Sequence, residues 1–191
     1  MNYNEIIELF SKQKVAKQLI KKRKFRNKIM EASSTTVETF MWLASKYPKH
    51  VAQHPNTPKE VLQKLAEHEN DDVRYCVACN TKCPNDILEI LAKDKNWDIV
   101  EKVVAHENFK DVSIETLKFL IIHPVSLIRS RVARKKNFAE FILTQFANDL
   151  DSHVRKRVAQ NPYTPKDVVK KLAEDKDDDV KKIAEQRLNK K

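Results

Sequence analysis

The amino-acid sequence predicts an all-α fold: a right-handed α-solenoid of about six short helix-pair repeats, preceded by a basic helical N-terminal cap. Three observations predict it. Pairs of small apolar residues recur along the chain, apolar residues between them fall at helical spacing, and hydroxyl, proline and asparagine residues mark helix ends. The chain has 191 residues, 41% of them hydrophobic, which suffices for a core.

The recurring apolar pairs set the repeat length. They stand 25 to 28 residues apart, a spacing typical of solenoid repeats. The pairs are Val51-Ala52, Val77-Ala78, Val104-Ala105, Val132-Ala133, Val158-Ala159 and Ile183-Ala184. We expect a cap over 1–34 and an array over 35–191, with units of approximately 35–56, 57–82, 83–111, 112–137, 138–163 and 164–191.

The units carry similar residues at the ends of their predicted helices. A threonine before a proline predicts a hydroxyl N-cap followed by proline at the first helical position. This applies to Thr57-Pro58 and Thr164-Pro165, and Thr35 with Glu38 takes the same place in the first unit. An acidic turn separates the two helices, and the second ends at an asparagine such as Asn80 or Asn161. Because the chain has no glycine, asparagine would have to supply any left-handed helix end.

The stretch from Val154 to Asp175 carries a family resemblance. Its pattern, V-R-x-x-V-A-x-N-P-x-T-P-x-x-x-L-x-x-L-A-x-D, is similar to the leucine-rich repeat variant, a HEAT-like helical repeat. The resemblance covers about residues 35–188 and weakens near 105–109 and 133–138, which lack the N-P-x-T-P linker. It implies an α-superhelix with a binding role, and it carries over no catalytic residues. We therefore expect a protein that is not an enzyme.

The charge balance favours anionic partners. The net charge is +10, from 37 Lys and Arg against 27 Asp and Glu. Much of it lies near the N-terminus, where no acidic residue occurs between Glu8 and Glu31. This segment is interpreted as a basic arm that follows phosphates, as a solvated helix face that caps the array, or as an amphipathic helix on anionic lipid.

A second group of cations follows from the repeat. Arg74, Arg129, Arg155 and Lys181 hold one repeat position and should form a ladder. We expect Asp71 or Asp72 to pair with Arg74, Asp151 with Arg155, and Asp178 with Lys181. Around Arg129 no acidic residue occurs between His123 and Glu140, so its cations are expected to be unpaired. The predicted polyanion-binding residues are Lys14, Lys17, Lys21, Lys22, Arg23, Lys24, Arg26, Lys28, Arg129, Arg131, Arg134, Lys135 and Lys136.

Three smaller motifs suggest metal chemistry. Cys76, Cys79 and Cys83 have a spacing seen in zinc and iron-sulfur sites, and one type of leucine-rich-repeat-variant protein carries an iron-sulfur cluster. That type places the cluster in a cysteine-rich N-terminal segment, which is missing here along with a fourth cysteine, so we expect surface thiols and no cofactor. The His50 and His54 pair lacks the glutamate of a zinc helix. The run that begins at Asp175 has Val180 where a calcium loop needs glycine.

The sequence therefore predicts a non-enzymatic binding module whose basic surface engages nucleic acid or an acidic protein. The alternative is a protein-protein scaffold that uses the concave face. A HEAT-like alkylpurine DNA glycosylase is a further alternative, for which only Trp97 and Asp98 offer a fragment of a site. An iron-sulfur-binding or zinc-binding leucine-rich-repeat-variant protein, with Cys76, Cys79 and Cys83 as ligands, is another. No apolar run is long enough to span a membrane and no signal-peptide region opens the chain, so we expect a cytoplasmic, monomeric protein.

Overall fold

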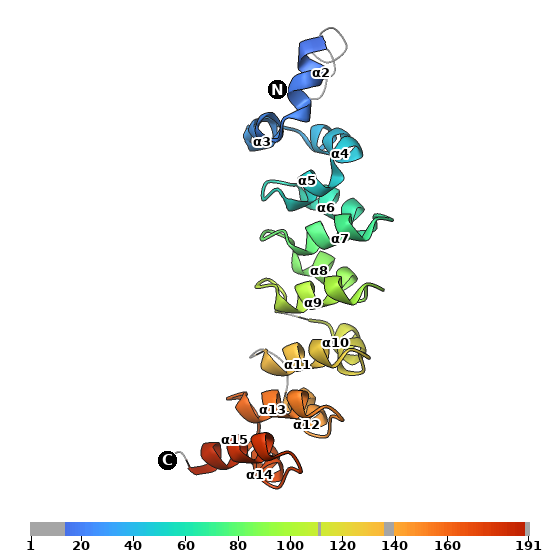
Figure 1. Cartoon of the computed structure of the whole chain (residues 1–191). Coiled ribbons are helices and arrows are strands. Elements are labelled where there is room, and N and C mark those ends of the chain that lie inside the picture. The colour runs from blue at the N-terminus through green and yellow to red at the C-terminus, as the bar shows by residue number, and fades with distance from the viewer. Residues whose placement is uncertain (1–13, 111, 136–139, 190–191) are drawn as a thin grey trace. The chain divides into compact units, whose positions relative to one another are not determined.

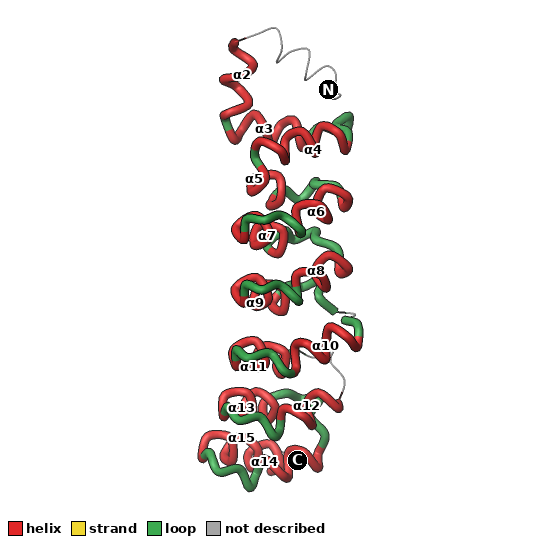
Figure 2. The backbone as a smooth tube through the Cα atoms, turned by 90° about the vertical axis from the view of Figure 1, so that its right-hand side faces the viewer, coloured by secondary structure: helices red, strands yellow, loops and turns green. Residues whose placement is uncertain are grey.

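The computed structural model describes residues 14–110, 112–135 and 140–189, with only the backbone described for 14–17. Within these ranges the chain forms fourteen helices and no strand (Figure 2). The predicted all-α fold is therefore confirmed. The helices group into two compact units, one ending at Leu91 and the other beginning at Ala92.

The first unit contains seven described helices, shown from blue to green in Figure 1. They are α2 (Lys14–Lys21), α3 (Arg23–Glu31), α4 (Val37–Lys46), α5 (Pro48–Gln53), α6 (Lys59–Ala66), α7 (Asp71–Ala78) and α8 (Asn85–Leu91). Successive helices form pairs, and like members of neighbouring pairs pack on each other. Thus α4 packs on α6, α6 on α8, and α5 on α7.

The second unit repeats this arrangement. Its helices are α9 (Trp97–Ala105), α10 (Ile114–Ile121), α11 (Ser126–Arg134), α12 (Glu140–Phe146), α13 (Ser152–Gln160), α14 (Lys166–Leu172) and α15 (Asp178–Asn189). The second members of the pairs, α9, α11, α13 and α15, pack on one another in that order, and α10 packs on α12. None of the described helices is long and apolar enough to cross a membrane.

The recurring apolar pairs form the core, as their spacing predicts. Val77 with Ala78 and Val158 with Ala159 are fully buried, because they lie on the helix faces that meet the neighbouring helices. In α9 the predicted register is wrong by one residue. Val103 and Val104 are the buried pair, whereas Ala105 is exposed.

Helix ends are closed by side chains rather than by left-handed residues. Among the described residues none has a positive φ, and Asn161 is extended, with φ −73° and ψ 121°. The predicted left-handed asparagine caps are therefore wrong. Instead, the Asn161 Nδ2 group donates to the Ala133 and Lys135 carbonyls of the preceding pair, at 2.7 and 3.1 Å. Asn80 makes the same two bonds to the carbonyls of residues 52 and 54.

The threonines before proline also have a different role from the one predicted. Thr57 and Thr164 are buried, and each hydroxyl donates a hydrogen bond to the carbonyl six residues earlier. Thr57 donates to Val51 and Thr164 to Val158, each at 2.6 Å. Neither caps the helix that follows, where proline occupies the N-cap position without a side-chain bond. Thr35 likewise donates to an earlier carbonyl, and its neighbour Thr36 is the N-cap of α4. These threonine hydroxyls therefore satisfy a backbone carbonyl near the end of the preceding helix.

The turn inside each helix pair uses one acceptor at a fixed position. Asp94, Asp149 and Asp175 each accept the backbone N–H two residues ahead, at 2.8 to 2.9 Å. His68 and His123 make the same bond through Nδ1, at 3.0 and 3.2 Å. An unprotonated imidazole nitrogen therefore substitutes for a carboxylate oxygen in this turn.

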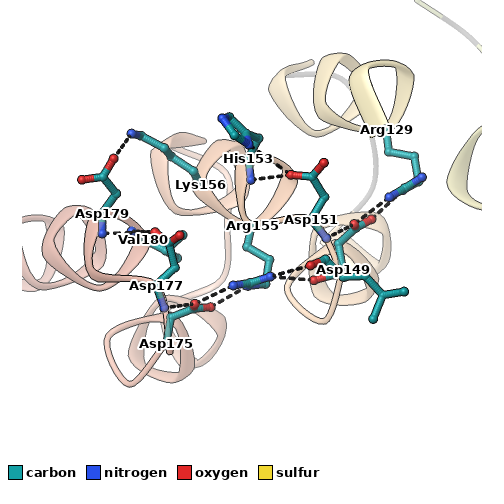
Figure 3. A network of polar contacts seen from close by, with 11 residues as sticks. Arg129, Asp149, Asp151, His153, Arg155, Lys156, Asp175, Asp177, Asp179 and Val180 are labelled. Atoms are coloured by element: carbon teal, nitrogen blue, oxygen red, sulfur yellow. Dashed lines mark hydrogen bonds and ion pairs between the residues drawn. The ribbon is translucent and has the colours of Figure 1, made fainter. Parts of the chain in front are cut away.

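Buried arginines link consecutive turns (Figure 3). The Arg155 guanidinium binds both carboxylate oxygens of Asp175 at 2.8 Å and donates to the Asp149 carbonyl at 2.9 Å. Arg129 binds the Asp149 carboxylate in the same bidentate way, at 2.7 and 2.8 Å. The predicted pairing of Arg155 with Asp151 is wrong, because the partner stands 20 residues ahead. The prediction that Arg129 is unpaired is also wrong.

The other two ladder positions differ. Arg74 pairs with Asp71 at 2.6 Å, as predicted. In the described part of the chain no ion pair joins Lys181 to Asp178, and both side chains are exposed. The guanidinium of Arg74 also donates to the carbonyls of residues 68 and 69, as that of Arg155 does to the carbonyls of residues 149 and 150.

Replacing Arg155 with methionine should destabilise the protein strongly. The substitution leaves the buried Asp175 carboxylate without its partner, which costs about 3–5 kcal/mol of unfolding free energy. The control is Lys156→Met, which breaks an exposed pair with Asp179 and should cost less than about 1 kcal/mol. Denaturant unfolding of both variants measures this, and equal losses would contradict a structural role for Arg155.

Stability should fall as the pH is lowered from 7 to 5. Burial lowers the pKa of His123 below its ordinary 6.5, so the unfolded chain takes up a proton that the folded turn resists. The contribution of neutral His123 to the unfolding free energy is therefore fully present above pH 6.5 and is lost progressively below it. In His123→Asn the melting temperature should depend less on pH, since the amide oxygen keeps the turn bond. An unchanged pH dependence of the melting temperature in His123→Asn would contradict this role of the buried imidazole.

Candidate polyanion-binding surfaces

The first basic surface lies on α2 and α3. The side chains of Lys21, Lys22, Arg23 and Lys24 are all exposed around the turn between these helices, and Lys28 is exposed one turn later. Among the described residues none of these five cations has a hydrogen-bond or ion-pair partner. We call these five residues the α2–α3 basic surface. The side chains of Lys14 and Lys17, also predicted to bind, lie outside the described residues.

Arg26 has a structural role within the same segment. It is buried, and its Nη1 group donates to the carbonyls of Ile20 and Lys21 at 2.8 and 2.7 Å. Its guanidinium also lies 4.2 Å from the centre of the Tyr47 ring. These carbonyls lie six and five residues earlier, as do those that Arg155 reaches. A buried arginine thus holds the turn whose lysines face solvent.

The cations predicted on α11 are mostly engaged. Arg129 binds Asp149, and Arg131 forms an ion pair with Glu101 of α9. Lys135 donates to the carbonyls of residues 106 and 109, which is the role that asparagine has in other pairs, and burial lowers its pKa. Arg134 is exposed and has no partner in the described part of the chain. Lys136 lies outside the described residues.

A pocket of about 300 Å³ lies between α9 and α11. It is lined by Arg131, Arg134 and Lys135, together with Glu107. Arg131 forms an ion pair with Glu101, and Lys135 donates hydrogen bonds to backbone carbonyls. Only Arg134 therefore offers free donors to an anion here. The pocket by itself is a weak anion site.

Two basic residues that the sequence reasoning missed lie on α13. Lys156 and Arg157 are half-buried and flank a groove that also borders α11. Arg157 follows the N-cap of α13 by six residues, as Arg131 follows that of α11. This repeat correspondence was visible in the sequence. The stretch that carries the family resemblance includes both residues, so composition alone does not set them apart from the repeat.

The cysteines do not fit a metal site. Cys76 and Cys83 are buried, contrary to the expectation of surface thiols, and Cys79 is half-buried. Burial raises the pKa of Cys83 to about 12, which disfavours the thiolate that metals bind. Cys83 occupies the position of Thr57 and Thr164 in other pairs. Within the described ranges no three His, Cys, Asp or Glu side chains are grouped to hold a metal ion.

The remaining motifs have structural explanations. Burial, followed by the nearby Arg26 charge, lowers the pKa of His50 to about 4, and His54 accepts the Asn56 N–H at the end of α5. In the Asp175 run, the first carboxylate binds Arg155 and the next caps α15. The aromatic and acidic pair proposed for a glycosylase is exposed in the first turn of α9.

Comparisons with known proteins give no relative. No family model matches the chain, and no curated protein matches it. Function therefore has to be inferred from the surfaces described above.

Alkylation should separate the three cysteines. In the native protein at pH 8, iodoacetamide should modify Cys79 first, because Cys83 is fully buried and its thiol stays protonated. All three should react at similar rates once the protein is unfolded. Peptide mass spectrometry over a time course measures this. Rapid native modification of Cys83 would contradict the burial that excludes it as a metal ligand.

Proposed function

We propose that this protein is a non-enzymatic binding module whose α2–α3 basic surface engages the phosphate backbone of nucleic acid. We propose further that its helix pairs form a right-handed solenoid of about six units, of the leucine-rich-repeat-variant or HEAT-like kind. The recurring bonds support this. Those of Asn80 and Asn161 each reach back 28 and 26 residues, as expected for one repeating unit.

One observation carries the proposed binding role. Four consecutive cations, Lys21 to Lys24, are exposed around one turn, whereas Arg26, Arg129 and Lys135 of the predicted set are bound to carboxylates or carbonyls. Clustered free cations release counterions from a polyanion when they bind it, which drives association without reading sequence. Arg26 keeps the turn in place, so these charges are presented on a folded surface.

Nucleic acid is favoured over a lipid surface. Membrane-bound amphipathic helices insert an exposed apolar face into the bilayer. Here Ile20, Ile29 and Met30 of α2 and α3 are buried inside the unit, and Leu19 and Phe25 are partly buried. Among the described side chains of this segment, the exposed ones next to the turn are therefore charged and do not form an insertable apolar face.

A protein-protein scaffold is the second candidate function. Exposed aliphatic side chains in the second unit favour it, most clearly Ile122 and Leu150, which are 79% and 94% exposed. The glycosylase alternative rests on Trp97 and Asp98 alone. The cytoplasmic location and the monomeric state stay predictions.

Removing the cations of the turn should weaken nucleic-acid binding. In the variant with Lys21, Lys22, Arg23 and Lys24 changed to alanine, affinity for single-stranded oligothymidylate at low salt should fall by at least about ten-fold. The slope of log affinity against log salt should shrink by up to roughly 3, since each lost phosphate contact removes about 0.7. Fluorescence anisotropy over a salt series measures both.

The matched control changes four other exposed lysines to alanine, which lowers the net charge equally. These are Lys166, Lys170, Lys176 and Lys182. The control should retain most of the affinity. Equal losses in the two variants, or no binding by the wild type at low salt, would contradict the proposed surface.

A further inference from the structure

A groove of about 510 Å³ lies between α11 and α13 in the second unit. Its volume falls within the usual range for ligand sites, about 300–1,000 Å³. Ser126, Leu127 and Ser130 line it from α11. His153, Lys156 and Arg157 line it from α13. The α2–α3 basic surface belongs to the other unit, so this groove is a separate site.

The lining of the groove carries a net positive charge, because Lys156 and Arg157 outnumber Asp151. Neither Ser126–Arg134 nor Ser152–Gln160 includes an Asp or Glu, whereas α7 and α9 carry aspartate in their first turns. Asp151 accepts the His153 N–H at 2.8 Å, and the Ser126 hydroxyl holds the pKa of its carboxyl below the usual range, so this residue stays anionic. Two cations therefore face one carboxylate in the lining.

Lys156 and Arg157 can both serve an incoming anion. Lys156 pairs with Asp179, but the Asp179 side chain is 70% exposed, and exposed pairs contribute little energy. Arg157 donates from Nη1 to the neutral Gln160 side chain at 2.9 Å. A carboxylate in the groove would gain a charge-assisted bond that glutamine cannot provide.

The apolar residue that lines the groove with these cations, Leu127, is unusual for this repeat. It is 44% exposed at the second position after the N-cap, where α7 and α9 have Asp72 and Asp98. The turns that precede α11 and α13 also expose Ile122 and Leu150, although these two do not line the groove. Aliphatic side chains at these positions add nothing to phosphate binding, but they supply apolar area that a peptide can cover.

We propose that the groove between α11 and α13 docks an acidic segment of a partner protein in which carboxylates alternate with leucine-like side chains. Lys156 and Arg157 bind the carboxylates, and Leu127 packs against an aliphatic side chain of the partner. The charge complementarity sets the sign of the partner, and the exposed aliphatic residues distinguish a protein segment from nucleic acid.

Three labelled peptides test this with the full chain by fluorescence anisotropy. The first alternates glutamate with leucine, the second has serine in place of leucine, and the third has lysine in place of glutamate. The first should bind at least about ten-fold more tightly than either of the others, since covering leucine and pairing the carboxylates each contribute. Equal binding of the first two would overturn the proposal.

Variants locate the site. Leu127→Asp restores the residue type found at this position in α7 and α9, so the variant should fold. Its affinity for the first peptide should be about ten-fold lower or more. Ile90→Asp is the control, because Ile90 on α8 is also 44% exposed. The double variant Lys156→Glu with Arg157→Glu keeps Leu127, and its affinity for the same peptide should also fall. Unchanged affinity in both groove variants would sink the idea.

Nucleic acid at this groove is the competing outcome. Oligothymidylate that displaces the first peptide, and that loses affinity in the double variant, would assign the groove to phosphate binding and overturn the proposal. The variant lacking the four cations of the α2–α3 turn should bind the peptide normally. Failure of the nucleic-acid proposal would therefore leave the peptide result intact, and the reverse also holds.

Discussion

Backbone carbonyls at the ends of the second helices need hydrogen-bond donors, and the next helix pair supplies them. Asn80 and Asn161 each reach two carbonyls of the pair before, and Lys135 and Arg187 do the same with cationic groups. The chain has no glycine, and none of the described residues takes the left-handed conformation, so these long-range bonds satisfy the carbonyls in place of such a cap. Each pair therefore depends on its neighbour for polar satisfaction as well as for apolar burial.

The same dependence explains the buried arginines. A guanidinium at the Arg155 position closes its own turn through two carbonyls and then binds the carboxylate of the following turn. Pairing is bidentate and sheltered, unlike the exposed pairs at Lys49 or Lys59. Hydrogen bonding to Arg155 accordingly lowers the pKa of Asp175.

The all-α class and most of the core could be predicted because apolar periodicity directly reflects which residues meet other helices. Polar roles could not be predicted as well. Thr57 before a proline satisfies the rule for an N-cap, yet its hydroxyl faces the preceding carbonyl, a choice that depends on the tertiary path. Arg155 has Asp151 near it in sequence, but Asp175 lies closer in space.

The candidate surfaces show a similar limit. Counting basic residues identified Lys21 to Lys24, which are free, but also Arg26 and Lys135, which are bound to carbonyls. A sequence gives the number of cations, whereas only three-dimensional contacts tell which ones remain available. Lys156 and Arg157 show the opposite case, since they lie within the stretch that matches the repeat pattern best and only the contacts show that they line a groove.

The exchange of aspartate and histidine in the turn inside the pairs shows that one position meets two separate requirements. Asp149 and His123 each accept the backbone N–H two residues ahead, with the same turn geometry. Only the carboxylate can also form a bidentate bond with the arginine of the preceding pair, as Asp149 does with Arg129. Histidine therefore preserves the shape of a turn without the ion pair that ties it to its neighbour, so successive pairs can differ in how firmly they are coupled.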